Sequence, residues 1–381
     1  MMNLIVAVNI MFLILSDIAP HLKSLRCCGF YQLGSDSSKI NRILHSVFMR
    51  LIFFFVLLYT FQQIVKVYKV NDLNKVIDTM FLMLTNSDCI YKAVVFWKSS
   101  DQIEALLNIL TGPLFNQKKP EHREFLREAI RQAKLLLRGF NIAAVFTCLL
   151  WALYPVILYV QRKPVEFAIW LPFDANLSPF YFAIFYVWVQ TSWLAFSNTS
   201  MDAFATSFLV QSKAQLSILR LDLEHVVEKS KEEAVETSGD FRNILERRLK
   251  IILMHYNEII KFSNLTQKIF GGAVMYLFTI SGWIMCTTAY RLVSVSLIIY
   301  VLKIYCSSHL PLLSEKLMES AYALDWLVIP IKHRRALILF MERIKRNINL
   351  MAGNLIPISN STFVSVVRSS YTFYAFLKNS S

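Results

Sequence analysis

The sequence predicts an all-α, polytopic membrane protein with seven transmembrane helices, a cytoplasmic N-terminus and an extracellular C-terminus. Hydrophobic residues make up 55% of the chain, whereas soluble domains average about 45–50%. Several apolar runs approach the roughly 20 residues that a helix needs to cross a bilayer. Lysine and arginine are distributed unevenly between the segments that join these runs, which indicates the orientation.

Seven apolar runs are candidate spans. Five are clear, at residues 43–64, 139–160, 179–211, 269–290 and 292–314. The run at 73–97 is weaker because Lys75, Asp78, Asp88 and Lys92 interrupt it. The last run, residues 354–377, is rich in serine, threonine and tyrosine and contains Arg368 near its middle.

The basic residues orient these spans. Residues 1–50 carry 5 lysines and arginines, 98–138 carry 8, 212–268 carry 10 and 303–346 carry 8, together 31 of the 40 in the chain. Cytoplasmic loops are the ones enriched in these residues. The N-terminus is therefore predicted inside and the C-terminus outside, the reverse of a G-protein-coupled receptor. The net charge of +14 is thus a topology signal, and no nucleic-acid-binding motif accompanies it.

Residues 4–15, LIVAVNIMFLIL, are too few to span a bilayer. They fit an interfacial helix, or the core of a signal peptide that lacks a basic n-region. If this segment did insert, every later span would reverse its direction.

The cytoplasmic segments have helical patterns of their own. In 121–140, 215–236 and 247–262, apolar residues recur at intervals of three and four with charges between them. We expect the spans to continue as helices into the cytoplasm and to pack together there. His255 fits a hydrogen bond between helices better than a metal ligand. Asp202, within an apolar run, is either a functional carboxylate or the partner of a basic neighbour.

Motifs for catalysis, nucleotide binding or metal binding are absent from the sequence. We therefore expect no enzyme activity, no cofactor and no metal site. Aromatic residues extend about four turns deep into the third and fourth spans, which fits either a pocket for a small volatile or lipid-like ligand, or plain packing between helices. They are Trp151, Tyr154, Phe180, Tyr181, Phe182, Phe185, Tyr186, Trp188 and Trp193.

The C-terminal part resembles the signature of insect odorant receptors. Ala321, Tyr322 and Trp326 match an A-Y-x-x-x-W element, and a basic helix with Arg334 and Arg335 follows. Further matches are Ala352-Gly353, Pro357, Phe363 and the closing Ser370-Tyr371-Thr372-Phe373-Tyr374. Residues 201–223 and 249–270 are also similar to the family. The T-Y and Q-F ending of the related gustatory receptors is absent, and the apolar residues 1–20 depart from the family pattern.

The resemblance implies an odorant-specific subunit of a ligand-gated, non-selective cation channel, assembled as a heterotetramer with a common co-receptor. It implies a multi-pass protein of the plasma membrane in the dendrite of an olfactory sensory neuron, in contact with lipid. The implied organisation is a cytoplasmic N-terminal segment (1–42), six transmembrane helices with the ligand pocket in their outer halves (43–303), a cytoplasmic anchor region (304–353), and a pore-lining seventh helix with a short extracellular tail (354–381).

A pore-lining seventh helix explains the polar last run, because a helix facing water tolerates hydroxyl side chains. Packing between helices is the alternative use of small hydroxyl residues. The family resemblance places the pore and gate at Ser370, Tyr374 and Leu377. Arg368 must face protein, water or the outer vestibule, because exposing it to lipid would cost about 2.5 kcal/mol or more.

The resemblance also places the odorant pocket in the outer halves of spans two, three, four and six. The matching positions are Met80, Phe81, Leu84, Thr147, Trp151, Tyr154, Phe182, Tyr186, Val189 and Tyr300. A G-protein-coupled chemoreceptor and a gustatory-type receptor channel are the alternative functions. A transporter is disfavoured, because only 9 glycines are present and no internal repeat is visible.

Overall fold

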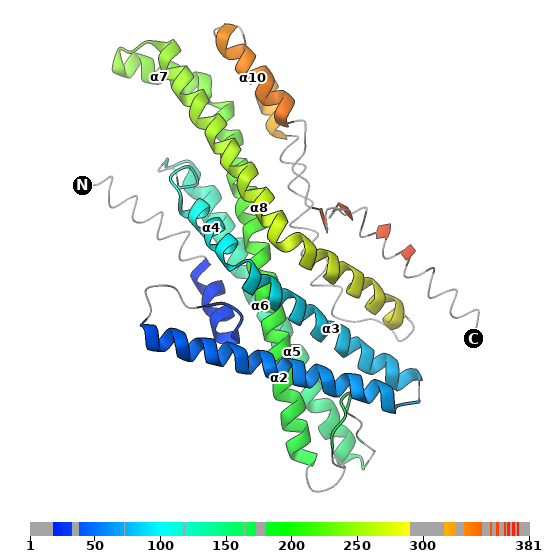
Figure 1. Cartoon of the computed structure of the whole chain (residues 1–381). Coiled ribbons are helices and arrows are strands. Elements are labelled where there is room, and N and C mark those ends of the chain that lie inside the picture. The colour runs from blue at the N-terminus through cyan, green and yellow to red at the C-terminus, as the bar shows by residue number, and fades with distance from the viewer. Residues whose placement is uncertain are drawn as a thin grey trace.

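The computed structural model of the chain is almost entirely helical (Figure 1). It describes residues 18–32, 38–71, 73–116, 119–162, 165, 167–172, 180–289, 316–324, 326, 331–344, 351–352, 356–357, 362, 364–365, 368–369 and 372. Residues 4–15, the predicted span 292–314, and most of 354–377 lie outside this description.

The helices match the predicted segments closely. They are α2 (Lys39–Lys69), α3 (Leu73–Lys98), α4 (Ser100–Thr111), α5 (His122–Val160), α6 (Phe180–Glu224), α7 (Val226–Thr237), α8 (Phe241–Ala289) and α10 (Ile331–Ile344). Residues 18–28 and 316–322 are also helical. A two-residue antiparallel ladder joins β1 (Met351–Ala352) to β2 (Ile356–Pro357). The predicted all-α class is confirmed.

Three helices are much longer than a bilayer is thick. At 45 residues, α6 extends over roughly 68 Å, while the hydrocarbon core is about 30 Å. The helices α5 and α8, with 39 and 49 residues, likewise join an apolar run to a charged amphipathic one. The predicted continuation of these apolar runs as long helices is confirmed.

Two described helices are apolar and long enough to cross a membrane by length and composition, Lys39–Lys69 and His122–Val160. Only 17% and 11% of their most apolar windows are buried inside the chain. Their apolar surface is therefore mostly turned outward, unlike that of a core helix in a soluble protein. The total of seven spans stays a prediction.

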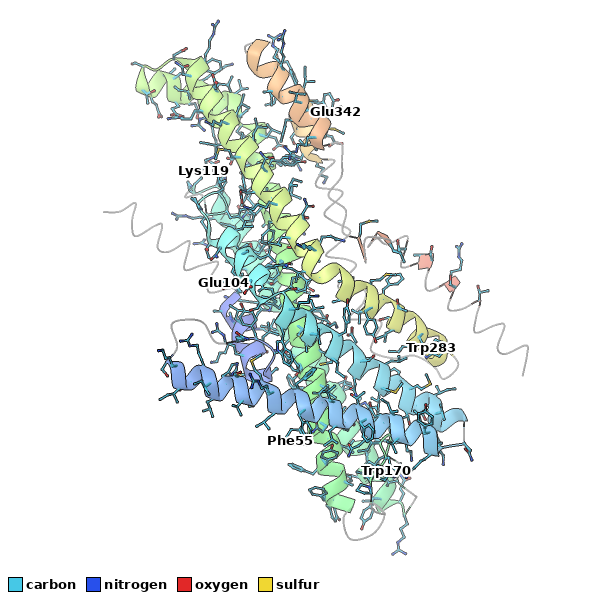
Figure 2. All side chains as sticks on the ribbon, viewed as in Figure 1. Phe55, Glu104, Lys119, Trp170, Trp283 and Glu342 are labelled. Carbon is cyan, nitrogen blue, oxygen red and sulfur yellow. The ribbon has the colours of Figure 1, made fainter. Side chains whose placement is uncertain are left out.

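The two ends of the molecule differ in character. The helices α7 and α10 lie at one end and the connection between α5 and α6 lies at the other (Figure 1). Lys119 and Glu342 lie toward the first end and Trp170 toward the second (Figure 2). The described ion pairs outside the apolar runs lie toward the end of the molecule that contains α7 and α10. They involve residues 119–131, 220–248 and 258–261.

An aromatic core joins α3, α6 and α8, and Phe96 of α3 packs against Phe204 and Phe270 with centroids 5.7 and 5.8 Å apart. The rings of Phe204 and Phe208 lie edge-on with centroids 4.8 Å apart, and Phe208 stacks against Phe270 at 5.9 Å. Phe262 packs against Phe208 from the preceding turns of α8. These rings are buried, and such pairs add about 0.5–1.5 kcal/mol beyond the area that they bury. The core therefore holds the three helices together, farther from the α5–α6 connection than the cavity described next.

Candidate functional site

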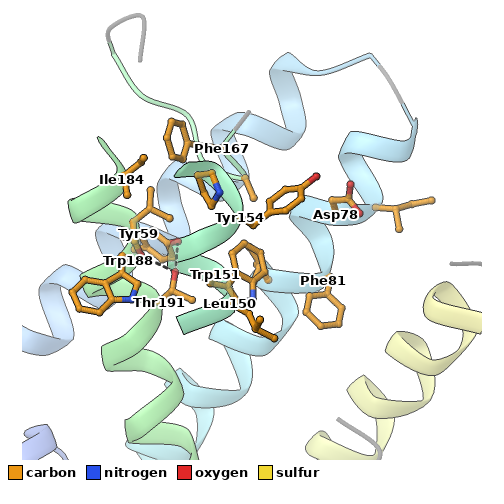
Figure 3. Close-up of a pocket in the computed structure, with 15 residues that line it drawn as sticks. Tyr59, Asp78, Phe81, Leu150, Trp151, Tyr154, Phe167, Ile184, Trp188 and Thr191 are labelled. Atoms are coloured by element: carbon orange, nitrogen blue, oxygen red, sulfur yellow. Dashed lines mark hydrogen bonds between the residues drawn. The ribbon is translucent and has the colours of Figure 1, made fainter. Parts of the chain in front are cut away.

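A cavity of about 470 Å³ lies between α2, α3, α5 and α6 near the α5–α6 connection (Figure 3). Its volume falls within the range of about 300–1,000 Å³ that is usual for small-molecule sites. Most of the lining side chains are aromatic or aliphatic. They are Tyr59, Ile77, Asp78, Phe81, Leu82, Leu150, Trp151, Tyr154, Pro155, Phe167, Ala168, Ile184, Val187, Trp188 and Thr191.

Helical spacing explains how each wall forms. On α6, Ile184, Val187, Trp188 and Thr191 follow the i, i+3, i+4, i+7 pattern and so share one face. On α5, Leu150, Trp151, Tyr154 and Pro155 share a face through spacings of three and four residues, and on α3 Ile77 and Phe81 lie four residues apart. Pro155 has no N–H group, so the carbonyl of Trp151 lacks its regular i+4 donor.

Described residues of the connection between α5 and α6 form one wall of the cavity. Phe167 and Ala168 belong to its lining, and Phe167 and Ile169 are buried. The backbone N–H of Trp170 donates to the carbonyl of Gln62 at 3.1 Å. The ammonium of Lys69 lies 4.4 Å from the Trp170 ring centroid, within cation–π distance. This connection is therefore held against the end of α2.

The polar groups at the inner wall of the cavity are bonded to one another. Tyr59 Oη lies 3.1 Å from Thr191 Oγ1, and Thr191 Oγ1 donates to the carbonyl of Val187 at 2.7 Å. Trp188 Nε1 donates to the carbonyl of Cys148 at 3.2 Å. Asp78 supplies a carboxylate at another wall (Figure 3). The cavity is thus apolar with a few fixed polar groups, as a site for a small organic ligand requires.

Of the predicted ligand positions, the structure brings Phe81, Trp151 and Tyr154 together in this cavity. Met80 and Leu84 are four residues apart, so they share one face of α3, and this face differs from the one that carries Phe81. They line a second cavity of about 1,010 Å³ between α3 and α8.

Four other predicted ligand positions, Thr147, Phe182, Tyr186 and Val189, do not belong to the lining of either cavity. Tyr186 packs edge-on against Tyr59 with centroids 6.2 Å apart and donates to Gln62 Oε1 at 2.9 Å. Thr147 donates to the carbonyl of Ala143 at 2.8 Å. Phe182 and Val189 are exposed. Tyr300 lies outside the described residues.

Sequence reasoning missed several lining residues, above all Tyr59 and Thr191. Tyr59 lies in the first span, which the family resemblance does not assign to the pocket. Thr191 follows Trp188 by three residues and Val187 by four, so the helical pattern around the predicted aromatic cluster contained a signal for it.

Few of the predicted pore residues are described. Arg368 is exposed, and Thr372 Oγ1 donates to its carbonyl at 3.0 Å. Ser370, Tyr374 and Leu377 lie outside the described residues. From the same run, Thr362, Ser365 and Ser369 line the second cavity beside α8.

Farther from the α5–α6 connection than the first cavity, a buried charge cluster joins α3 to α6. Lys92 Nζ lies 2.5 Å from Asp88 Oδ2 and 2.9 Å from Asp202 Oδ1, and donates to Asn198 Oδ1 at 2.6 Å. The side chains of Lys92, Asp88 and Asp202 are 4%, 1% and 6% exposed. Of the two interpretations of Asp202, the structure shows the pairing with a basic neighbour.

A second buried cluster lies among the charged helices. Asp222 of α6 accepts from Lys119 at 2.6 Å and contacts His122 Nε2 at 3.0 Å. Burial by itself raises the pKa of Asp222, but hydrogen bonds and charges from His122 and Lys119 outweigh burial and hold this pKa below its usual value. The start of α5 is thereby fixed to α6.

His255 extends this second cluster to α8. Its Nε2 donates to Gln215 Oε1 at 2.9 Å, and Gln215 Nε2 donates to the carbonyl of Phe115 at 3.1 Å. Burial, reinforced by the nearby charges of His122 and Lys119, lowers the pKa of His255 to about 4 despite the opposing Asp222. The predicted role of His255 in a hydrogen bond between helices is what the structure shows.

Comparison with known proteins identifies related chains over nearly the whole length. A family model described as "7tm Odorant receptor" matches residues 72–371. Odorant receptor Or1 of Anopheles gambiae is 21% identical over 366 residues, covering 85% of this chain and 86% of that protein. Odorant receptor 46a, isoform B, of Drosophila melanogaster is 22% identical over 377 residues, with coverages of 92% and 94%.

The fold also matches a solved structure. The insect olfactory receptor OR5 from Machilis hrabei in complex with eugenol superposes with a TM-score of 0.79 at 17% sequence identity. The superposition covers 96% of this chain and 98% of that one. A second structure of OR5 from Machilis hrabei superposes with a TM-score of 0.77, also at 17% sequence identity.

Proposed function

The chain belongs to the insect odorant receptor family, and from this premise we propose that it is an odorant-binding subunit of a ligand-gated, non-selective cation channel. Members of the family are membrane receptors rather than enzymes. The observation that carries the proposal is the aromatic cavity of about 470 Å³ between α2, α3, α5 and α6. A small volatile molecule, driven in by burial of its apolar surface, is the ligand that fits such a site.

The related OR5 receptor was solved in complex with eugenol, so a protein of this fold holds a small aromatic odorant. We place the odorant of this chain against Phe81, Trp151 and Tyr154, with Trp188 and Phe167 completing the enclosure. Three of these residues lie on helices that reach far beyond the cavity. A ligand that binds one arrangement of these helices better than another would shift their populations toward it.

The gating role assigned to the C-terminal run rests on the family resemblance, and the composition of the run supports it. Its hydroxyl side chains suit a water-filled pore, with Ser370, Tyr374 and Leu377 at the gate and Arg368 near the pore mouth. We assign the chain to a heterotetramer with the common co-receptor, held together by the charged helices. The assembly would lie in the plasma membrane of the olfactory neuron dendrite, with seven spans, the N-terminus inside and the C-terminus outside.

The cavity assignment is tested by recording odorant-evoked currents from cells that express this chain with the co-receptor. Tyr154→Ala removes a cavity wall and should raise the half-maximal odorant concentration by up to about tenfold, because a contact between aromatic rings contributes about 0.5–1.5 kcal/mol and about 1.4 kcal/mol corresponds to tenfold. Tyr181→Ala is the matched control, since Tyr181 is exposed to a similar extent as Tyr154 but lies outside the described lining. Equal effects of the two substitutions would place the ligand elsewhere.

The orientation is tested separately with an epitope tag after Ser381. Antibody staining of intact cells is expected, because seven spans from an internal N-terminus leave the C-terminus outside. Staining only after permeabilisation would mean that residues 4–15 insert, or that the arrangement is that of a G-protein-coupled receptor.

A further inference from the structure

The hydrogen bonds at the inner wall of the cavity define which chemical groups an odorant can use there. Tyr59 and Thr191 both line the cavity and are bonded to each other at 3.1 Å (Figure 3). Tyr59 is 2% exposed, so water does not compete for its hydroxyl as it would at a surface.

The direction of these bonds follows from counting protons. A threonine hydroxyl has one proton and two lone pairs. Thr191 uses its proton on the carbonyl of Val187, at the short distance of 2.7 Å. The bond between Thr191 and Tyr59 must then be donated by Tyr59. With its only proton engaged, Tyr59 offers the cavity lone pairs and no donor.

The other enclosed polar groups reinforce this acceptor character. The N–H of Trp188 is engaged with the carbonyl of Cys148 at 3.2 Å. Asp78 is an acceptor when ionised. Among the described lining residues there is no lysine, arginine or histidine. Trp151 and Tyr154 carry donors on the α5 wall and are 38% and 65% exposed, so the acceptor character belongs to the wall formed by Tyr59 and Thr191.

We infer that the cavity prefers odorants with a hydroxyl group, alcohols or phenols, over aldehydes, ketones and esters of the same skeleton. This inference rests on the proposed function. A hydroxyl donates to Tyr59 without disturbing the existing bonds. At the wall formed by Tyr59 and Thr191, a carbonyl meets only lone pairs unless Tyr59 turns away from Thr191, which leaves the buried Thr191 oxygen without its donor.

The test compares alcohols with the aldehydes of identical carbon skeleton, such as benzyl alcohol with benzaldehyde and 1-octanol with octanal. Each pair differs by two hydrogens, so size and apolar area stay matched. In cells expressing this chain with the co-receptor, alcohols should act at about 3- to 10-fold lower half-maximal concentrations, the effect of one neutral hydrogen bond.

Two substitutions make opposite changes to the proton arrangement. Tyr59→Phe removes the acceptor, so the alcohol loses potency and the two members of a pair become equal. Thr191→Val keeps the shape but releases the Tyr59 proton, so the aldehyde gains potency and the preference shrinks or reverses. Thr199→Val is the control, because Thr199 also donates to its own helix, to Ala195 O at 2.9 Å, away from the cavity.

The outcomes separate this inference from the proposed function. Currents evoked by odorants, with an alcohol preference that Thr191→Val leaves unchanged, refute the inference and leave the receptor function intact. The inference is also refuted, and the receptor function again left intact, if the wild-type chain responds only to odorants without a hydroxyl. Loss of the alcohol preference in Asp78→Asn, but not in Thr191→Val, has the same meaning. Absence of any odorant-evoked current refutes both. Should Tyr59→Phe fail to reach the cell surface, the Thr191→Val result decides.

Discussion

Replacing Lys92 by methionine should destabilise the receptor strongly, because it leaves two carboxylates in the buried interface between α3 and α6. At an effective dielectric constant of about 20, two unit charges 2.9 Å apart attract by roughly 6 kcal/mol. Desolvation offsets much of this attraction in the intact cluster. Removing the cation leaves the desolvation of Asp88 and Asp202 uncompensated, which typically costs about 3–5 kcal/mol.

The assay is thermal unfolding of the detergent-solubilised protein, followed by fluorescence. With an unfolding entropy of about 2.1 cal/mol/K per residue, the 381 residues give a shift of roughly 4–6 °C in Tm for 3–5 kcal/mol. Lys98→Met is the matched control, since Lys98 is exposed at the end of the same helix. Its Tm should stay within about 1 °C of the wild-type value, because exposed substitutions usually change stability by less than about 0.5 kcal/mol.

Neutralising the whole cluster provides the decisive comparison. The triple variant Asp88→Asn, Lys92→Met, Asp202→Asn removes the carboxylate charges together with the ammonium, so most of the lost stability should return. A single Lys92→Met variant as stable as Lys98→Met would refute the argument. A triple variant no more stable than the single one would show that the lysine contributes through packing rather than charge.

Three further outcomes follow from other parts of the chain. Burial lowers the pKa of His255 to about 4, so its contribution to stability is complete above its unfolded pKa of about 6.5 and is lost as pH falls toward 4. The free energy of unfolding should therefore fall by about 2 kcal/mol between pH 7 and pH 5. His255→Gln should flatten the pH dependence of Tm in that range. Phe208→Ala opens a cavity in the fully buried aromatic core and should cost about 3–5 kcal/mol, seen as reduced surface expression and Tm. Arg368→Ala should alter conductance or gating while leaving surface expression unchanged, and unchanged currents would refute a position at the pore.

The sequence predicts the helices well because hydrophobic length and charge are local properties. The runs at 43–64, 73–97 and 139–160 fall within α2, α3 and α5, and the amphipathic pattern before residue 139 correctly extends α5 back to His122. The boundary between α3 and α4 lies at Ser99, whose backbone departs from helical geometry at φ −102° and ψ 17°, and no glycine or proline marks this position in the sequence.

The site was harder to predict because it depends on helix rotation and on contacts between distant segments. Met80 and Phe81 are neighbours in sequence, yet they line different cavities. The partners Lys92 and Asp202 are 110 residues apart, and Tyr59 and Thr191 are 132 apart. Sequence composition identified Asp202 as unusual but could not name its partner, since that depends on how α3 packs against α6.

The most direct test of the proposed channel is to apply odorants to outside-out membrane patches from cells that express this chain with the co-receptor. The patch has lost its cytosol, and the pipette solution contains no GTP. An odorant-evoked cation current that reverses near 0 mV is expected, because in the proposed channel the ligand-binding helices and the pore belong to the same assembly. A response that appears only in intact cells, or only with GTP in the pipette, would contradict the channel mechanism and favour signalling through G proteins.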